Sequence, residues 1–281
     1  MKKKYLTWIC LLIIVIAFFF IAFNNCLVVT KYTIETEKVN NMIRLAVLTD
    51  LHATQYGENQ IELINKMKDQ RPDAFLLVGD IFDENRDKEP VMELLSAIGT
   101  EYPGFYVSGN HEFWSGEVDT WKKMVESYGV TVLEGDTVTI EIHGEKIQIS
   151  GVDDPDGFLS ASTIQGEEKG SWQEQFDFAN NSVDPALYSV LLSHRPESVQ
   201  LYNNSNFDLI VSGHAHGGQI RLPFLMKGLY APNQGFFPKY SKGLYNLGNA
   251  NMIVSAGLCK SALPRIFNPP EVVIIDIVPV L

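Results

Sequence analysis

The sequence has 281 residues, a length that suits one large domain or two small ones. Its hydrophobic content of 46% and charged content of 20% are ordinary for a globular protein. The formal net charge of -12 argues against a nucleic-acid-binding surface, which would need clustered lysine and arginine. We therefore expect no nucleic-acid partner, and bound cations would neutralise part of the acidity.

The N-terminus has the pattern of a membrane anchor. Three lysines, Lys2 to Lys4, precede an uncharged run of nineteen residues from Tyr5 to Phe23. As a helix this run is about 28 Å long, close to the roughly 30 Å of bilayer hydrocarbon. We predict an uncleaved transmembrane helix in residues 1–25, with the lysines in the cytoplasm and the remainder outside the cytoplasm, at the cell membrane. A removed signal peptide is the alternative, but its apolar core is usually shorter, about 7–15 residues.

The three cysteines form no framework. Cys10 lies within the apolar N-terminal run, and Cys26 and Cys259 are isolated. We expect free, structural thiols, with a disulfide between Cys26 and Cys259 as the alternative.

The remainder of the chain has the alternation of an α/β protein. Residues 26–41 are predicted to form a tether, and residues 42–281 a single catalytic domain. Short apolar runs predict buried strands at 42–49, 74–78, 104–107, 188–192 and 207–212. Helical spacing predicts helices at 58–70, 89–98, 118–128 and 197–203.

Other segments complete this outline. Alternating residues on either side of His143-Gly144 predict a hairpin over 137–149. Closing strands are expected at 252–255 and 272–278, whereas residues 153–185 and 222–245 have no clear period.

Polar side chains follow five of the predicted strands directly. They are Asp50 and His52, Asp80, Asn110 and His111, His194, and finally His214 and His216. Each group by itself has an ordinary explanation, such as a helix cap or a turn. Ligands of open α/β sheets, however, bind at the carboxyl ends of strands, where the loops converge. We therefore expect these side chains at one rim of the sheet, and we expect His143 to be a surface residue.

The chemistry of this set favours metal ions. Carboxylate, imidazole and amide donors suit Mn²⁺, Fe²⁺/³⁺, Zn²⁺ or Co²⁺. Seven donors exceed what one ion needs and are about right for two, and two adjacent ions need a bridging carboxylate. Asp80 is placed for that bridge. The glycines around His214 and His216 are expected to permit a tight turn that presents both imidazoles.

The motifs resemble those of the calcineurin-like metallophosphoesterases. The matching blocks, within residues 44 to 220, are Asp50-Leu51-His52, Gly79-Asp80, Gly109-Asn110-His111-Glu112, Ser193-His194 and Gly213-His214-Ala215-His216. The resemblance implies a four-layer αββα sandwich of two mixed sheets flanked by helices. The tail further resembles the membrane-associated bacterial branch, which includes secreted phosphodiesterase-like proteins and a UDP-diacylglucosamine pyrophosphohydrolase. The resembling tail segments are Gly217-Gly218-Gln219-Ile220, Phe236-Phe237-Pro238-Lys239-Tyr240 and Asn268-Pro269-Pro270-Glu271.

The resemblance also implies roles for individual residues. One metal ion would take Asp50, His52, Asp80 and His216, and the other Asp80, Asn110, His194 and His214. His111 would be the catalytic residue that binds the phosphoryl group or protonates the leaving oxygen. Glu112 would either orient His111 or act as a helix-start acid. Relatives often carry an arginine where this chain has Ser255-Ala256-Gly257, and its task would fall to Arg265 or Arg221.

These expectations add up to a membrane-anchored, monomeric, dinuclear-metal phosphoesterase, more specifically a phosphodiesterase. The apolar residues between Leu222 and Phe237 would form either an ordinary loop or a surface for a lipid-linked or cell-envelope phosphate ester. One alternative is a hydrolase similar to the UDP-2,3-diacylglucosamine pyrophosphohydrolases. Others are a non-catalytic metal-binding scaffold and a zinc hydrolase of another fold.

Overall fold

Two six-stranded mixed sheets form the centre of the protein. The structure is a computed structural model that describes residues 2–159, 170–260 and 263–280. The first sheet has the order β1 (Val28–Thr36), β14 (Glu271–Pro279), β2 (Ile43–Leu48), β3 (Ala74–Val78), β4 (Gly104–Val107), β5 (Thr131–Val132). The second has the order β12 (Gly243–Asn246), β13 (Asn251–Val254), β9 (Leu209–Ser212), β8 (Tyr188–Leu192), β7 (Glu145–Gly151), β6 (Thr137–Ile142).

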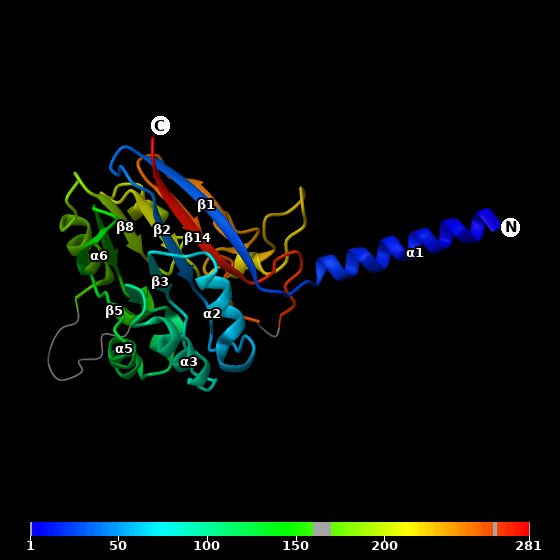
Figure 1. The fold of residues 1–281 in the computed structure, drawn as a ribbon, viewed down its shortest axis with the longest axis horizontal. Helices are drawn as coiled ribbons and strands as arrows, with labels where there is room; N and C mark the ends of the chain where they lie inside the picture. Colours follow the sequence, from blue (N-terminus) through cyan, green and yellow to red (C-terminus); the bar gives the residue numbers. More distant parts are fainter. Residues whose placement is uncertain (1, 160–169, 261–262, 281) are drawn as a thin grey trace.

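The sheets pack face to face, and helices cover their outer faces (Figure 1). Side chains such as Val47 and Val78 from the first sheet meet Ile149 and Val211 from the second in one buried layer. The first sheet is covered by α2 (Ile61–Lys68), α3 (Glu89–Ile98) and α5 (Val118–Ser127), and the second by α6 (Trp172–Asn181) and α7 (Val199–Tyr202). The layers are therefore helix, sheet, sheet, helix, as the resemblance implied.

Parallel strands at the centre of each sheet agree with the apolar runs. β2, β3 and β4 are parallel neighbours, as are β7, β8 and β9. These strands are buried on both faces, which explains their continuous apolar sequences. The expected hairpin is β6–β7, and its turn residues His143 and Gly144 have φ of 53° and 81°. Two consecutive positive φ values match the twist of paired strands.

The segment expected to be a tether differs from the prediction. Its residues Val28–Thr36 form β1, which pairs with β14 along its whole length and makes the edge of the first sheet. The partner strand lies near the other end of the chain, so no local sequence pattern reveals this pairing. The tether is therefore shorter than predicted, and Ile34 is part of the core between the sheets.

Segments without a clear period also contain short elements. Residues 222–245 hold the ribbon of β10 (Tyr230–Ala231) and β11 (Gly235–Phe236) and the start of β12. Within 153–185 the structure has the 3₁₀ turn η2 (Pro155–Phe158) and α6, while residues 160–169 lie outside the described part. The predicted helix at 58–70 is divided into η1 (Glu58–Gln60) and α2, because Asn59 and Gln60 have positive φ.

The apolar N-terminal run forms α1 (Lys2–Ala22), which extends away from the sheets (Figure 1). Among the residues that the structure describes, however, no helix is both long enough and apolar enough to cross a membrane. Lys2, Lys3 and Lys4 occupy the first turn of α1, so its apolar stretch is shorter than the helix. The predicted membrane-spanning helix is therefore not confirmed.

Candidate metal centre

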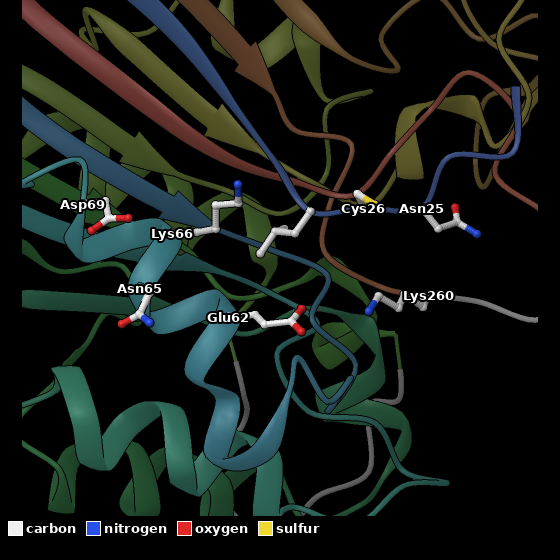
Figure 2. Close-up of a pocket in the computed structure, with 8 residues that line it drawn as sticks. Asn25, Cys26, Glu62, Asn65, Lys66, Asp69 and Lys260 are labelled. Carbon is white, nitrogen blue, oxygen red and sulfur yellow. The ribbon is translucent and has the colours of Figure 1, made fainter. Parts of the chain in front are cut away.

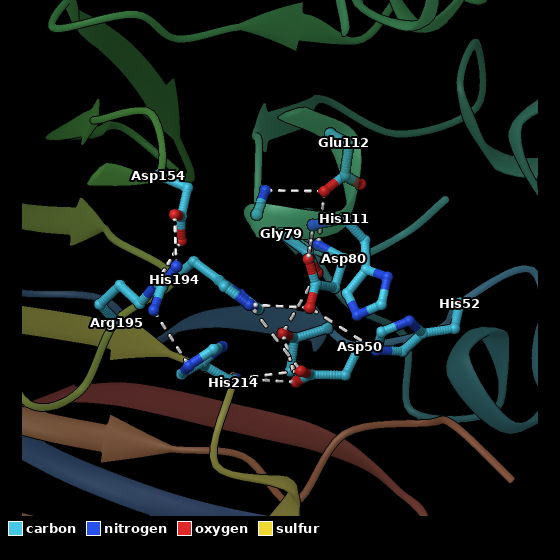
Figure 3. A network of polar contacts seen from close by, with 12 residues as sticks. Asp50, His52, Gly79, Asp80, His111, Glu112, Asp154, His194, Arg195 and His214 are labelled. Atoms are coloured by element: carbon cyan, nitrogen blue, oxygen red, sulfur yellow. Dashed lines mark hydrogen bonds and ion pairs between the residues drawn. The ribbon is translucent and has the colours of Figure 1, made fainter. Parts of the chain in front are cut away.

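The ends of five strands bring all eight predicted site residues to one rim. Figure 3 shows Asp50, His52, Asp80, His111, His194 and His214 at this rim. Asp50 and His52 follow β2, and Asp80 follows β3. Asn110 and His111 open α4 (Asn110–Trp114), directly after β4. From the second sheet, His194 follows β8, while His214 and His216 follow β9, His216 opening the 3₁₀ turn η3 (His216–Gly218). Both sheets thus contribute to one cluster.

Two neighbouring groups of ligand atoms lie within this cluster. Asp50, His52 and His216 form one group, and Asp80, His194 and His214 form the other, with ligand atoms within 4.8 Å of one another in each. Asp80 lies between them, because its Oδ2 is 3.1 Å from Nε2 of His194 and 3.6 Å from Nε2 of His52. His214 and His216, two residues apart, therefore face different groups.

Four buried candidate ligand atoms at this rim have no hydrogen-bond partner. They are Nε2 of His52, Oδ1 of Asn110, Nε2 of His194 and Nδ1 of His216. A buried polar atom without a partner is costly, typically about 1–3 kcal/mol, and four at one place need a common explanation. Each has a free lone pair in a suitable tautomer, so the donor set fits divalent metal ions.

Hydrogen bonds on the opposite ring nitrogens set the imidazole orientations. The Nδ1 atom of His194 donates to the carbonyl of Val78 at 2.8 Å, which leaves its Nε2 to face Asp80. Nε2 of His214 lies 2.8 Å from Oδ1 of Asn233, so its Nδ1 remains for a ligand. Such partners fix the tautomer and ring direction of metal-binding histidines.

Buried charges dominate the electrostatics. Burial raises the pKa of Asp50, despite the nearby His194. Burial also opposes ionisation of Asp80, but His194, together with His52 and His111, holds its pKa well below the usual range. Burial and the charges of His194 and Arg195 lower the pKa of His214 to about 3, so this imidazole is neutral. Ionised Asp80 and neutral His214 are the forms that bind metal. Although burial opposes it, Asp80 raises the pKa of His194 to about 10, so a metal ion that binds its Nε2 would displace a proton.

The backbone of the rim is unusually strained. Five of the seven candidate ligands have φ between 46° and 62°: Asp50, His52, Asp80, His214 and His216. Residues with a Cβ rarely adopt this left-handed region, and each costs on the order of 1–3 kcal/mol. Strain of this kind is typical of functional sites, where the surrounding structure fixes the direction of a side chain.

Glycines allow the strand ends to approach closely. A Cβ on Gly213 would lie 2.0 Å from Oγ1 of Thr49 and 2.4 Å from Oδ2 of Asp50. A Cβ on Gly109 would lie 2.2 Å from Oδ1 of Asp80. From the sequence, the glycines around His214 and His216 are expected to allow dihedral angles that other residues rarely adopt. This prediction is confirmed for Gly217 and Gly218, which have positive φ. At Gly213 the requirement is space, and the histidine that follows it takes the positive φ.

Glu112 does not orient His111. Its buried carboxylate accepts the backbone N–H groups of Asp80, Ile81, Phe82 and Gly109 at 2.8 to 3.1 Å. Burial, with the nearby Asp80, raises its pKa to about 7. Glu112 is therefore the helix-start acid of the two expected roles, and it also ties the loop after β3 to the start of α4.

The carboxylate beside His111 is that of Glu84, which the sequence analysis did not predict. Its Oε2 lies 2.7 Å from Nδ1 of His111. The neighbouring Asp83 contacts Nδ1 of His52 at 3.3 Å. In the sequence, these two acidic residues are notable only because they follow Gly79-Asp80 closely. Their position does not indicate which histidine each one contacts.

A buried arginine supports the second group of ligands. Arg195 pairs with Asp154 through Nε and Nη2 at 2.6 and 2.7 Å (Figure 3). Its Nη1 donates to Oδ1 of Asn233 at 2.7 Å. Asn233 in turn contacts His214. The sequence read Asp154 only as part of a turn, and the position of Arg195 next to His194 was the available clue.

Of the two arginines considered as substitutes, Arg265 reaches the Ser255-Ala256-Gly257 segment. Its Nη1 donates to the carbonyl of Ala256 and its Nε to that of Cys259, both at 2.8 Å. Arg221 instead contacts the carbonyl of Gly217. Through these hydrogen bonds the buried Arg265 supports the segment from Ala256 to Cys259, which packs behind Asp50.

A cavity of about 590 Å³ lies outside this centre, between α2 and the segment that follows α1 (Figure 2). Its lining includes Cys26, Glu62, Lys66 and Lys260, and none of the described lining residues is a candidate ligand. Cys26 is a free thiol, as are Cys10 and the buried Cys259, in agreement with the sequence analysis. His143 is also on the surface as expected, beside Asp73.

Comparison with known proteins identifies the fold and the chemistry of the centre. The sequence model described as calcineurin-like phosphoesterase matches residues 43–218, which contain every candidate ligand. The chain belongs to the calcineurin-like phosphoesterase family. Membership implies a metal-dependent hydrolase of phosphoric esters, and the family name given to the sequence motifs is thereby confirmed.

Relatives of this family are similar along most of the chain. An uncharacterised metallophosphoesterase of Campylobacter jejuni is 29% identical over 95% of this chain and 68% of its own length. A Bos taurus protein named as a transmembrane protein with a metallophosphoesterase domain is 27% identical over 80% of this chain and 50% of its own. Among solved structures, a 5'-nucleotidase precursor of Thermus thermophilus has a TM-score of 0.50 at 16% identity, over 85% of this chain and 54% of that one. That likeness shows the fold alone.

Proposed function

We propose that the chain hydrolyses a phosphate ester, more specifically a phosphodiester, at a centre that holds two divalent metal ions, and that it acts as a monomer. The observation that carries the proposal is that three buried imidazole nitrogens without hydrogen-bond partners surround the carboxylates of Asp50 and Asp80. Manganese, zinc and iron ions all suit these donors.

The two groups of side chains divide the ions between them. Asp50, His52 and His216 would hold one ion, and Asn110, His194 and His214 the other. Asp80 would belong to both, since it faces His52 and His194 at once. Bound divalent ions supply a water molecule of lowered pKa and positive charge beside the phosphoryl oxygens.

His111 moves a proton in the proposed reaction. Its Nδ1 donates to the Glu84 carboxylate, so Nε2 is the ring atom left to bind the ester or to protonate the leaving oxygen. Its ring lies against that of His52, with 4.4 Å between centroids, which places it beside the first group. Glu84 holds the ring direction and stabilises the imidazolium.

Hydrolysis of an aryl phosphodiester and an aryl phosphomonoester by the full chain loaded with Mn²⁺ or Zn²⁺ tests the proposal. We expect faster turnover of the diester and complete loss in Asp80→Ala. Asp119→Asn, an exposed carboxylate on α5, is the matched control. Two bound ions without hydrolysis of either ester would instead favour the non-catalytic scaffold.

We also propose that the substrate is a lipid-linked or cell-envelope phosphate ester, met at a membrane outside the cytoplasm. The exposed apolar side chains of α1 and the name of the Bos taurus relative support a membrane location. A diacylated UDP-sugar pyrophosphate is the alternative substrate. Release of a nucleoside monophosphate from such a substrate, in excess over diester turnover, would favour that alternative.

A further inference from the structure

Exposed apolar side chains gather where α1 meets the domain. Phe18 and Ile21 of α1, together with Leu222, Pro223, Leu225 and Phe267, line an apolar cavity of about 350 Å³. We call these six residues and Phe224 the junction patch. Phe224 is fully exposed, and Leu225 is 85% exposed. In Figure 1 the yellow segment that contains the loop lies on the side from which α1 extends.

The loop of the patch is held in a fixed shape. Leu222 and Met226 exchange two backbone hydrogen bonds of 2.9 Å, which closes the loop and leaves Phe224 at its tip. Phe224 has a φ of 68°, a conformation that a bulky side chain rarely adopts. Phe267 has a φ of 49°, and its N–H donates to the carbonyl of Ala22 at the end of α1. The chain thus accepts backbone strain at two aromatic residues, exposing the ring of Phe224 and seating that of Phe267 against Phe18 of α1, with 5.3 Å between ring centroids.

The helix beside the patch is apolar on every side. All six side chains of residues 11–16 are between 46% and 64% exposed, and six consecutive residues cover more than one full turn. A second copy of the chain would cover only one stripe of such a helix, as a surface helix on a globular core does. Lipid covers all sides.

Charges at the border of the patch agree with a lipid surface. Lys227 is exposed directly after the loop, and Arg221 directly before it lines a cavity together with Lys227, Phe224 and Phe267. Positive side chains next to an apolar surface are attracted to anionic headgroups.

We propose that the junction patch docks onto the surface of a lipid bilayer, with Phe224 and Leu225 among the acyl chains and Lys227 among the headgroups. Docking would bring the metal centre close to the bilayer. Nδ2 of Asn268, the neighbour of Phe267, donates to the carbonyl of His216 at 2.7 Å, and the loop begins six residues after His216. The inference deepens the proposed membrane location, but docking does not depend on hydrolysis.

Fluorescence quenching tests the docking with the full chain. Phe224→Trp is bound to vesicles of phosphatidylcholine and phosphatidylglycerol with or without brominated acyl chains, and the parent spectrum is subtracted. We expect the added signal to lose most of its intensity with brominated lipid. Phe178→Trp is the matched control, because Phe178 is 63% exposed on α6, away from α1 (Figure 1); its signal should not change. Leu225→Asp in the Phe224→Trp background should reduce the quenching.

Native Trp8 in α1 separates the other outcomes. Quenching of Trp8 without quenching at position 224 would show that α1 alone meets lipid and would overturn the proposal. Size-exclusion chromatography would detect dimers that the protein forms without lipid. If the indole introduced by Phe224→Trp is shielded from solvent in such dimers, the patch binds a second copy of the chain and the docking proposal is overturned. Turnover of a water-soluble diester, measured on the same variant, reports the proposed catalysis independently.

Discussion

Oε2 of Glu84 lies 2.7 Å from Nδ1 of His111, and no other described carboxylate is bonded to this ring. The pair joins the loop after β3 to the start of α4. Because the carboxylate accepts a hydrogen bond from Nδ1–H, it fixes the tautomer and the direction of the ring. Glu84 is thus a positioning residue for the proposed proton transfer.

Replacement of Glu84 should lower the rate without releasing metal. We expect Glu84→Ala to reduce kcat by roughly 10–100-fold, the usual cost of removing such a partner, with KM and metal content nearly unchanged. Glu84→Gln should recover part of the rate, since its amide oxygen still accepts from Nδ1, but its pH–rate profile should move. Glu93→Gln on α3 is the control. Loss of metal in Glu84→Ala would contradict a purely positioning role.

His111 itself should matter more to the chemistry. His111→Ala removes the proton donor, so we expect a fall in kcat of about 10²–10⁴-fold with both ions retained, measured by elemental analysis of the purified protein. The deficit should shrink for esters whose leaving group needs no proton. His143→Ala, the histidine in the β6–β7 turn, should have full activity. A metal-depleted His111→Ala protein would make His111 a ligand instead.

His214 and His216 should serve different ions, since one faces Asp80 and His194 and the other Asp50 and His52. Each of the variants His214→Ala and His216→Ala is expected to bind one ion per chain, measured by metal titration, and the double variant none. Equal loss of both ions in each single variant would show that the two groups are one coupled site.

The sequence predicted the rim because each polar residue follows a buried strand at once, and strand ends of parallel sheets share an edge. It did not predict β1, since Val28 to Thr36 pair with a strand more than two hundred residues away. Glu112 was assigned two roles because it adjoins His111, but successive residues on a helix point about 100° apart. Glu84 and Asn233 lie in loops, and only the folded chain shows which histidine each one meets.

Space at Gly213 should be essential for the centre. Gly213→Ala would place a Cβ 2.0 Å from Thr49 Oγ1 and 2.4 Å from Asp50 Oδ2, so the strand ends must separate. We expect weaker metal binding and a lower melting temperature. Gly248→Ala is the control, because a Cβ at Gly248 would meet open space and its only cost is the positive φ of this residue. We expect this variant to lose about 1 kcal/mol of stability and to keep its metal affinity. Normal metal binding in Gly213→Ala would show that the rim adapts to the added methyl group.

The position of β1 determines where the chain can be shortened. A chain that begins at residue 26 keeps β1, whereas one that begins at residue 41 loses it and leaves β14 as an open edge. Loss of the buried Leu27 and Ile34 removes roughly 1.5–3 kcal/mol each, and an unpaired strand promotes aggregation. We therefore expect the shorter chain to melt at a lower temperature and to aggregate, by calorimetry and light scattering, while the longer one matches the full domain. Equal melting temperatures would mean that β1 contributes little to the first sheet.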